Sequence, residues 1–455
     1  MKTRINFKDE FYQKLKLLVL PIAIQNFMLA LVSATDAIML GWIDQTSLSA
    51  VSLAGQVQFV LSLFISGIAA GAGIMAEQYW GKQDAASIEK VIPIALRTNL
   101  LFSGLFTILA GFCPEMLMRI FTNDAALVAS GSQYLRAVAL SYVLCGISQV
   151  YLILLKNTGH AAVSSRISST AVVLNIILNA ILIYGLCGAP ALGIRGAAYA
   201  TVAARVVELI WAYLETKKPE RVRILWNRLF SSAGKILSED FWRYTLPVLA
   251  ASLVWGIAYV LYSVIMGHMG SDAVAANSIT SIAKSLLSCL IRGVSGGAGV
   301  LIGNLLGANE LEKAREYGRR LSHLSIAIGI VTGGLLMLIS PAIVHFAPLS
   351  DTAAEYLQYM LLFCGLNLMA QSVNTTVLDG IFCAGGDAKF DMQGNIGAMW
   401  CFSVPLGFLA AFWLKLPVMV VYCIVNLDEI VKLPAVYHHY KKYIWVRNIT
   451  RDVED

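Results

Sequence analysis

The chain alternates long apolar runs with short polar breaks. Most runs hold about 20 residues or more, the length that a helix needs to cross roughly 30 Å of hydrocarbon. Twelve runs can be counted, centred at about residues 28, 63, 105, 142, 175, 205, 256, 291, 330, 366, 402 and 426. The pattern therefore predicts an all-α membrane protein with twelve transmembrane helices.

Composition supports a membrane protein. Hydrophobic residues make up 58% of the chain and charged residues 14%, whereas a soluble domain carries about 25% charged residues. The charged segment MKTRINFKDEFYQKLK precedes no short apolar core with a cleavage site, so we expect the first span to stay in the mature protein. The eight cysteines form no CxxC pair and predict neither a metal site nor disulfides. We expect no cofactor.

The basic residues follow alternate loops. They gather in the N-terminal segment, in the loops near Lys82, Lys156 and Lys313, in the stretch 217–235 and in the C-terminal tail, whereas the intervening loops hold almost none. Cytoplasmic loops are the ones enriched in Lys and Arg. This predicts a multi-pass protein of the cell membrane with both termini cytoplasmic. Because the charge lies in loops, the net charge of +6 requires no nucleic-acid partner.

The two halves of the sequence repeat each other. The dipeptide Leu20-Pro21 recurs at Leu246-Pro247, an offset of 226 residues, and the same offset aligns GIAAGAGIMAEQYWG (67–81) with GVSGGAGVLIGNLLG (293–307). The repeat predicts two pseudo-symmetric six-helix bundles (6+6): an N-terminal lobe over 1–216, a cytoplasmic connecting segment over 217–241, and a C-terminal lobe with its tail over 242–455. Parallel duplication of this kind is typical of secondary transporters.

One carboxylate, Asp36, lies in the first apolar run. An ionisable group at membrane depth is costly and usually faces a cavity or a partner. Asn175 and Asn179 stand four residues apart on one helical face, and Thr201 lies early in the next span. Together these four side chains would suit a hard monovalent cation such as Na⁺. Alternatively, the carboxylate alone carries a proton, or the asparagines only join helices.

The eighth run is unusually polar. Lys284 and Arg292 lie eight residues apart and hence nearly on one face. They are expected either to line the substrate cavity and favour anionic or zwitterionic substrates, or to pair with an acid such as Asp379. Further candidates for the cavity, for which ordinary packing is the alternative, are Met28, Trp255, Tyr259 and Tyr262. Asp379 is a candidate for the cavity as well, and internal pairing is its alternative.

Several motifs together resemble the multidrug and toxic compound extrusion (MATE) family. They are ATDAIMLG, GAGIMAEQYWGKQD, LNIILNAILIYG, GAAYAT, VLIGNLLGANE and GGDAKF. The resemblance implies a cation-driven exporter that binds Na⁺ or H⁺ through Asp36, with Asn175, Asn179 and Thr201 at the matching positions. In some members an aspartate replaces Asn179. Many members also carry a glutamate early in span 7, where this chain has none.

The sequence thus predicts a cation-coupled antiporter, driven by H⁺ or Na⁺, that exports small amphipathic organic compounds. The alternative is a flippase for lipid-linked saccharides or lipids on a related duplicated bundle, which Lys284 and Arg292 partly favour. An enzyme is not expected, because the chain has no HExxH and its G-x-S-x-G string lies inside a predicted span instead of a strand-to-helix turn. The expected partners are a small-molecule substrate and the bilayer, and we expect a monomer.

Overall fold

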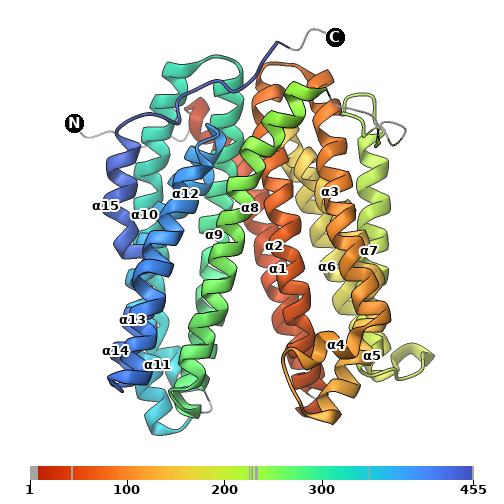
Figure 1. Ribbon diagram of the computed structural model, residues 1–455, viewed down its shortest axis with the longest axis vertical. Coiled ribbons are helices and arrows are strands. Elements are labelled where there is room, and N and C mark those ends of the chain that lie inside the picture. Colours follow the sequence, from red (N-terminus) through yellow and green to blue (C-terminus); the bar gives the residue numbers. More distant parts are fainter. Residues whose placement is uncertain are drawn as a thin grey trace. The chain divides into compact units, whose positions relative to one another are not determined.

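A computed structural model describes residues 9–41, 45–224, 226, 229–230, 234–347 and 349–452, and within them all regular elements are helices. The helices of the first half of the chain are α1 Glu10–Gly41, α2 Gln45–Gly81, α3 Ala85–Phe112, α4 Pro114–Arg119, α5 Ala125–Leu155, η1 Lys156–His160, α6 Ala161–Tyr184, η2 Leu186–Gly188 and α7 Ile194–Thr216 (Figure 1).

The second half follows the same plan until its last third, where the helices are more broken. Its elements are α8 Lys235–Gly267, α9 Ser271–Gly307, α10 Leu311–Phe346, α11 Asp351–Thr375, η4 Thr376–Phe382, α12 Ala388–Asn395, η5 Ile396–Ser403, α13 Val404–Phe408, η6 Leu409–Trp413, α14 Val418–Val425 and α15 Asp428–Tyr440 (Figure 1).

Ten stretches of the described chain are long and apolar enough to cross a membrane. One of them, 125–184, contains two of the predicted spans, because η1 joins α5 to α6 through a bend at Gly159, whose φ is +81°. The last predicted span is interrupted after Val425 and forms α14 and α15. Each of these two helices is too short to be counted by itself among the ten stretches. Every predicted span therefore corresponds to helix, and the all-α twelve-helix fold is confirmed.

The internal repeat reappears in the helix boundaries. α2 begins at Gln45 and α9 at Ser271, and they end at Gly81 and Gly307, so each pair of boundaries is 226 residues apart. The last residues of α1 and α8, and the first residues of α3 and α10, obey the same offset. The duplication read from the glycine pattern is thus a duplication of helices.

The chain folds into two compact units whose boundaries lie inside helices. Unit 1 comprises Met1–Asn26 and Ala250–Arg451, and unit 2 comprises Phe27–Leu249 and Asp452–Asp455. The sequence boundaries place the division in the basic segment 217–241. Instead, α1 and α8 each contribute their first part to the unit that is otherwise built from the other half of the chain. Only packing between distant segments produces this exchange.

Two glycines on α2 explain why the first part of α8 belongs to unit 2. A Cβ atom added at Gly71 would lie 2.7 Å from Cα of Thr245, and one added at Gly67 would lie 2.9 Å from Cα of Leu249. Side chains larger than hydrogen would therefore collide with the backbone of α8. Small residues let helix backbones approach closely where lipid removes the hydrophobic drive between helices. The first part of α8 consequently packs against α2.

The same contact occurs in unit 1 between α9 and the first part of α1. A Cβ added at Gly293 would lie 3.0 Å from Cα of Ala23, and one at Gly297 would lie 2.9 Å from Cγ2 of Val19. Each of these four residues lies 226 positions from its counterpart in unit 2. The second helix of each half thus packs against the first helix of the other half.

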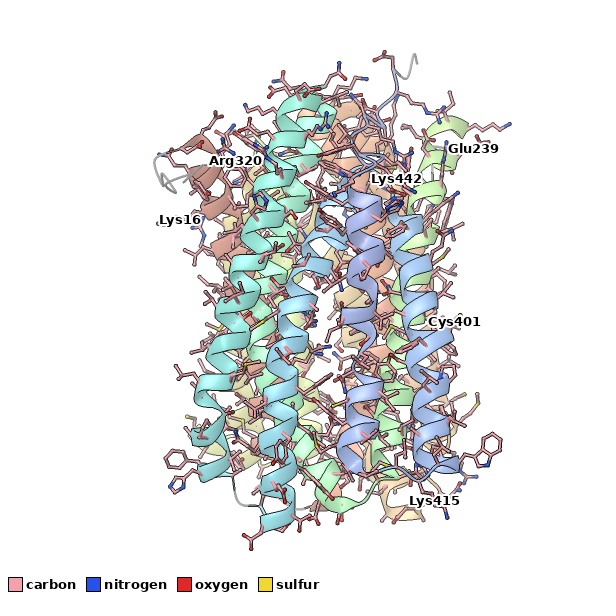
Figure 2. The ribbon with its side chains drawn as sticks, turned by 90° about the vertical axis from the view of Figure 1, so that its left-hand side faces the viewer. Lys16, Glu239, Arg320, Cys401, Lys415 and Lys442 are labelled. Atoms are coloured by element: carbon pink, nitrogen blue, oxygen red, sulfur yellow. The ribbon has the colours of Figure 1, made fainter. Side chains whose placement is uncertain are left out.

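Basic side chains gather toward one end of the helices in unit 1. Figure 2 shows Lys16, Arg320 and Lys442 toward that end and Lys415 at the opposite one. Arg320 donates a hydrogen bond from Nη1 to Oδ2 of Asp9, just before α1 begins. This guanidinium holds the pKa of the Asp9 carboxyl below its ordinary value.

Candidate cation site and substrate cavity

The four residues predicted to bind a cation lie together in unit 2. Nδ2 of Asn179 donates a hydrogen bond of 2.6 Å to Oδ1 of Asp36 and one of 3.1 Å to Oδ1 of Asn175. Nδ2 of Asn175 lies 3.3 Å from Oγ1 of Thr201. The side chains thus form one hydrogen-bonded series across α1, α6 and α7. The structure thus places the four residues singled out from the sequence side by side.

Local structure positions each member of the series. Asn175 and Asn179 are i and i+4 on α6 and are buried, with 7% and 1% of their surface exposed. Thr201 also donates to the backbone oxygen of Ala197 one turn earlier in α7. The hydroxyl of Tyr184 donates a 2.7 Å hydrogen bond to the backbone oxygen of Met39, which ties the end of α6 to α1 close to Asp36.

The amide of Asn179 presents its nitrogen to the carboxylate. Its Oδ1 is buried and has no hydrogen-bond partner within the described chain. The amide group therefore acts toward Asp36 as a donor. In this orientation it stabilises a carboxylate and supplies no oxygen to a metal ion beside it.

A cavity of about 360 Å³ opens onto this series. Drug-sized ligands occupy cavities of about 300–1,000 Å³. The described residues lining the cavity are Leu29, Val32, Asp36, Gly55, Gln58, Phe59, Ser62, Tyr134, Ala171, Val172, Asn175, Thr201, Ala204, Arg205 and Glu208. The wall combines apolar with polar side chains and carries both signs of charge.

Sequence reasoning missed two of the charged residues in this wall. Nη1 of Arg205 donates to both carboxylate oxygens of Glu208, at 2.9 and 3.0 Å, and Oγ of Ser148 donates to Oε1 of Glu208 at 2.6 Å. Glu208 is 2% exposed, whereas 20% of the Arg205 side chain is exposed. The string AARVVE in the sixth apolar run was the available signal, because charges inside a span usually face a cavity or a partner.

Lys284 and Arg292 lie in unit 1 on α9, but not as an ion pair with Asp379. Nζ of Lys284 donates a 2.8 Å hydrogen bond to Oδ1 of Asn367. Within the described chain, no ion pair of 4 Å or less joins either cation to Asp379. Asp379 and Arg292 both have exposed side chains and lie within electrostatic reach of each other. The pairing expected for Lys284 is therefore made with an amide instead.

A buried ionic cluster in unit 1 was also missed. Nζ of Lys432 lies 2.9 Å from Oε1 of Glu429, 4.0 Å from Oδ2 of Asp428 and 3.2 Å from Oδ1 of Asn395. The carboxyl of Asp391 accepts a hydrogen bond of 3.2 Å from the same asparagine. Lys432 is 5% exposed and the three acids are 5–9% exposed. The signal was the acidic and basic composition of the last span, LDEIVK.

The aromatic candidates for the substrate cavity divide into two kinds. Trp255 and Tyr259 stack with their ring centroids 5.6 Å apart, and Tyr259 is 44% exposed. Tyr262 is 9% exposed and belongs to an apolar core cluster with Ala258. Met28 lies on α1 in unit 2, and the described residues lining the cavity do not include it.

Duplicated helices and a cavity lined by charged side chains are features typical of secondary transporters. The family model MatE matches residues 21–181 and 247–409. Its two matches begin at Pro21 and Pro247, which reproduces the 226-residue offset of the repeat. The chain belongs to the MatE family, and the predicted family resemblance is confirmed.

Relatives in sequence agree with this membership. The "Uncharacterized transporter YisQ" of Bacillus subtilis is 21% identical over 427 residues, covering 94% of this chain and 93% of the relative. The "Probable multidrug resistance protein NorM" of Agrobacterium fabrum is 24% identical over 390 residues, covering 84% and 83%.

Solved structures share the fold. A MOP superfamily transporter from Pyrococcus furiosus, described as having a binding pocket of reverse polarity, superposes with a TM-score of 0.86 at 19% identity, covering 98% of this chain and 99% of that one. A MATE protein in complex with MaL6 gives the same TM-score at 19% identity, covering 96% and 97%.

Proposed function

We propose that this protein is a cation-coupled antiporter that exports small amphipathic organic compounds by alternating access. Membership of a family of multidrug efflux transporters supports export. Coupling to a cation is supported by the position of Asp36. This carboxylate lines a ligand-sized cavity and accepts a hydrogen bond from Asn179. A cation and a substrate that use the same cavity are positioned to exclude each other.

Competition between the cation and the substrate for Asp36 would make the two move in opposite directions. With the carboxylate ionised, the cavity attracts a positively charged group. Binding of a coupling cation neutralises the carboxylate and weakens that attraction, so the substrate leaves as the cation enters. A ligand shifts a conformational equilibrium only through its different affinities for the two states, and such coupling acts reciprocally on both ligands. Asp36 is therefore the residue through which gradient and export are linked.

The orientation of the Asn179 amide favours H⁺ over Na⁺ as the coupling ion. Na⁺ requires several oxygen ligands directed at one point, but Asn179 presents nitrogen to Asp36. Binding Na⁺ would require this amide to rotate and to give up its hydrogen bond to Asn175. A proton needs only one carboxylate oxygen. We propose that Asn175 and Thr201 hold Asn179 in its donating orientation.

The protein is proposed to act in the cell membrane as a monomer with both termini in the cytoplasm. Support comes from the alternating distribution of Lys and Arg along the loops and from the basic end of unit 1 seen in Figure 2. In this orientation, the proposed export carries the substrate from the cytoplasm to the outside.

Flux into or out of proteoliposomes under imposed gradients tests the proposal. A pH gradient should drive transport of an amphipathic cationic dye, and D36N should abolish that drive. Asp351→Asn is the matched control, because Asp351 is an exposed carboxylate at the start of α11. Gradient-driven flux that survives in D36N would contradict the proposal. Movement of a fluorescent lipid-linked saccharide between leaflets, without dye transport, would instead support the flippase.

A further inference from the structure

The cavity lined by Asp36 is also lined by an arginine, and this arginine is not paired with that aspartate. Arg205 lies one helical turn beyond Thr201 on α7, so both side chains project from the same face. Within the described chain, no ion pair of 4 Å or less joins Arg205 to Asp36. Asn179, Asn175 and Thr201 form the hydrogen-bonded series that starts at Asp36 and ends one turn from Arg205. The wall thus presents a carboxylate, Asp36, and a guanidinium, Arg205, that do not pair with each other.

The pairing of Arg205 with Glu208 leaves part of the guanidinium available. A fork-to-fork pair would use two nitrogens, but here Nη1 alone contacts both oxygens of Glu208. Among bonds joining described residues, those of the guanidinium all come from this one nitrogen. Because Glu208 is almost fully buried and Arg205 is 20% exposed, the positive end of the pair faces the cavity.

We propose that Arg205 anchors an anionic group of the substrate, so that the cavity selects zwitterionic compounds. A positively charged amine would bind at Asp36, a carboxylate or similar anion at Nη2 and Nε of Arg205, and an apolar body between them. Phe59, Val32 and Val172 supply apolar wall for that body. A purely cationic compound places no anion at Nη2 and Nε of Arg205, and a purely anionic one meets the charge of Asp36. Complementary charge fixes specificity and orientation in this way.

This inference rests on the proposed function, because it assigns the substrate class of the same cavity. The amine end competes with the coupling cation at Asp36, and the anionic end at Arg205 does not. A zwitterion would therefore still move in the direction opposite to the coupling cation. An anion without an amine would bind better when Asp36 is neutralised, and it would couple in the opposite direction by linkage.

Equilibrium binding to the purified transporter in nanodiscs, without any gradient, tests the anchor separately from transport. The probes are an aryl-piperazine carboxylic acid, its methyl ester and its N-acetyl derivative, which share one aromatic body and differ in charge. We expect the zwitterionic acid to bind at least about tenfold more tightly than either derivative, the size of effect typical of a charge-assisted hydrogen bond.

The double variant R205Q/E208Q removes the anchor without leaving a buried charge unpaired. It should bring the affinity for the zwitterion down to that of the ester and change affinity for the ester by less than about twofold. E208Q alone should tighten binding of the zwitterion, which a purely structural role of Arg205 would not do. Arg166→Gln on the exposed face of α6 is the control and should alter none of these affinities.

Equal affinity of the wild type for acid and ester would overturn the inference, as would equal losses for both in R205Q/E208Q or the absence of saturable binding of the acid. If flux proves independent of ion gradients while the zwitterionic acid still binds more tightly than its derivatives, the antiport proposal fails. The proposed role of Arg205 in binding an anionic group is then unaffected.

Discussion

Gly71 of α2 lies against Thr245 of α8 so closely that a Cβ on the glycine would stand 2.6 Å from the threonine Cβ. The repeat-related pair, Gly297 of α9 and Val19 of α1, makes the same approach in unit 1. Duplication has therefore preserved a contact and not only a helix pattern. Because each half donates the start of its first helix to the other unit, α1 and α8 each belong to both units.

Replacing Gly71 by Ala should destabilise the protein. The new methyl group would meet the backbone of Thr245 at 2.7 Å, and overpacking of this kind costs about 1–3 kcal/mol. G297A should cost less, because the nearest backbone atom there, the nitrogen of Val19, lies 3.4 Å away and the closer contact is to the Val19 side chain. The control is G104A, since nothing lies within 4 Å of a Cβ at that position, and Ala favours helix over Gly by about 1 kcal/mol. Thermal unfolding in detergent measures all three. An unchanged melting temperature for G71A would refute the close packing.

Replacing Asn179 by Asp should create a response to Na⁺. The variant would place a second carboxylate against Asp36 and exchange the donating nitrogen for an oxygen, which is the ligand type that hard cations prefer. We expect Na⁺ to raise the melting temperature of N179D and to leave the wild type unchanged, with choline at equal ionic strength as the control. A Na⁺ response of the wild type as large as that of N179D would contradict the assignment of H⁺.

Replacing Lys432 by Met should destabilise unit 1. Lys432 is the cation that contacts Glu429 and approaches Asp428, and all three are buried. Removing one partner from a buried ion pair costs about 3–5 kcal/mol because it leaves an uncompensated charge. K432M/E429Q should recover part of this loss.

The matched control for Lys432 is Lys442→Met, at an exposed lysine beyond α15. Melting temperature and yield from the membrane report the difference. If K432M and K442M melted alike, the ionic cluster would have no role in stability.

The contact between Asp9 and Arg320 predicts a pH dependence of stability. Arg320 lowers the pKa of Asp9 from the ordinary value of 3.8. A carboxyl whose pKa falls on folding stabilises the folded state above that ordinary value, and this contribution is lost as the pH drops through the lowered pKa. D9N should therefore melt below the wild type at pH 7, and the difference should shrink below about pH 3.8 and vanish once the pH is below the lowered pKa. The effect is expected to be small, since the pair is partly exposed. A difference that grows in acid would have the wrong sign.

Periodicity and charge were sufficient to predict the fold class and to single out four polar residues that the structure brings together. Long apolar runs can satisfy their backbone groups in lipid only as helices or closed barrels, so run length alone predicts the spans. Asp36, Asn175 and Asn179 were recognisable because polar groups inside such runs are costly and rarely incidental. Arg205, Glu208 and the cluster around Lys432 carry the same signal, but their roles depend on partners from other helices that spacing within one helix does not identify.

By itself, the sequence determined the helices, their duplication and the polar residues inside them, because the length and periodicity of apolar runs are local properties of the chain. Only the tertiary structure decided which helices the glycines of α2 and α9 face, how the units divide α1 and α8, and which charge Arg205 meets. These contacts join residues far apart in sequence, and the choice between them is made by backbone approach and by burial of charge. Neither of these leaves a pattern within a single span.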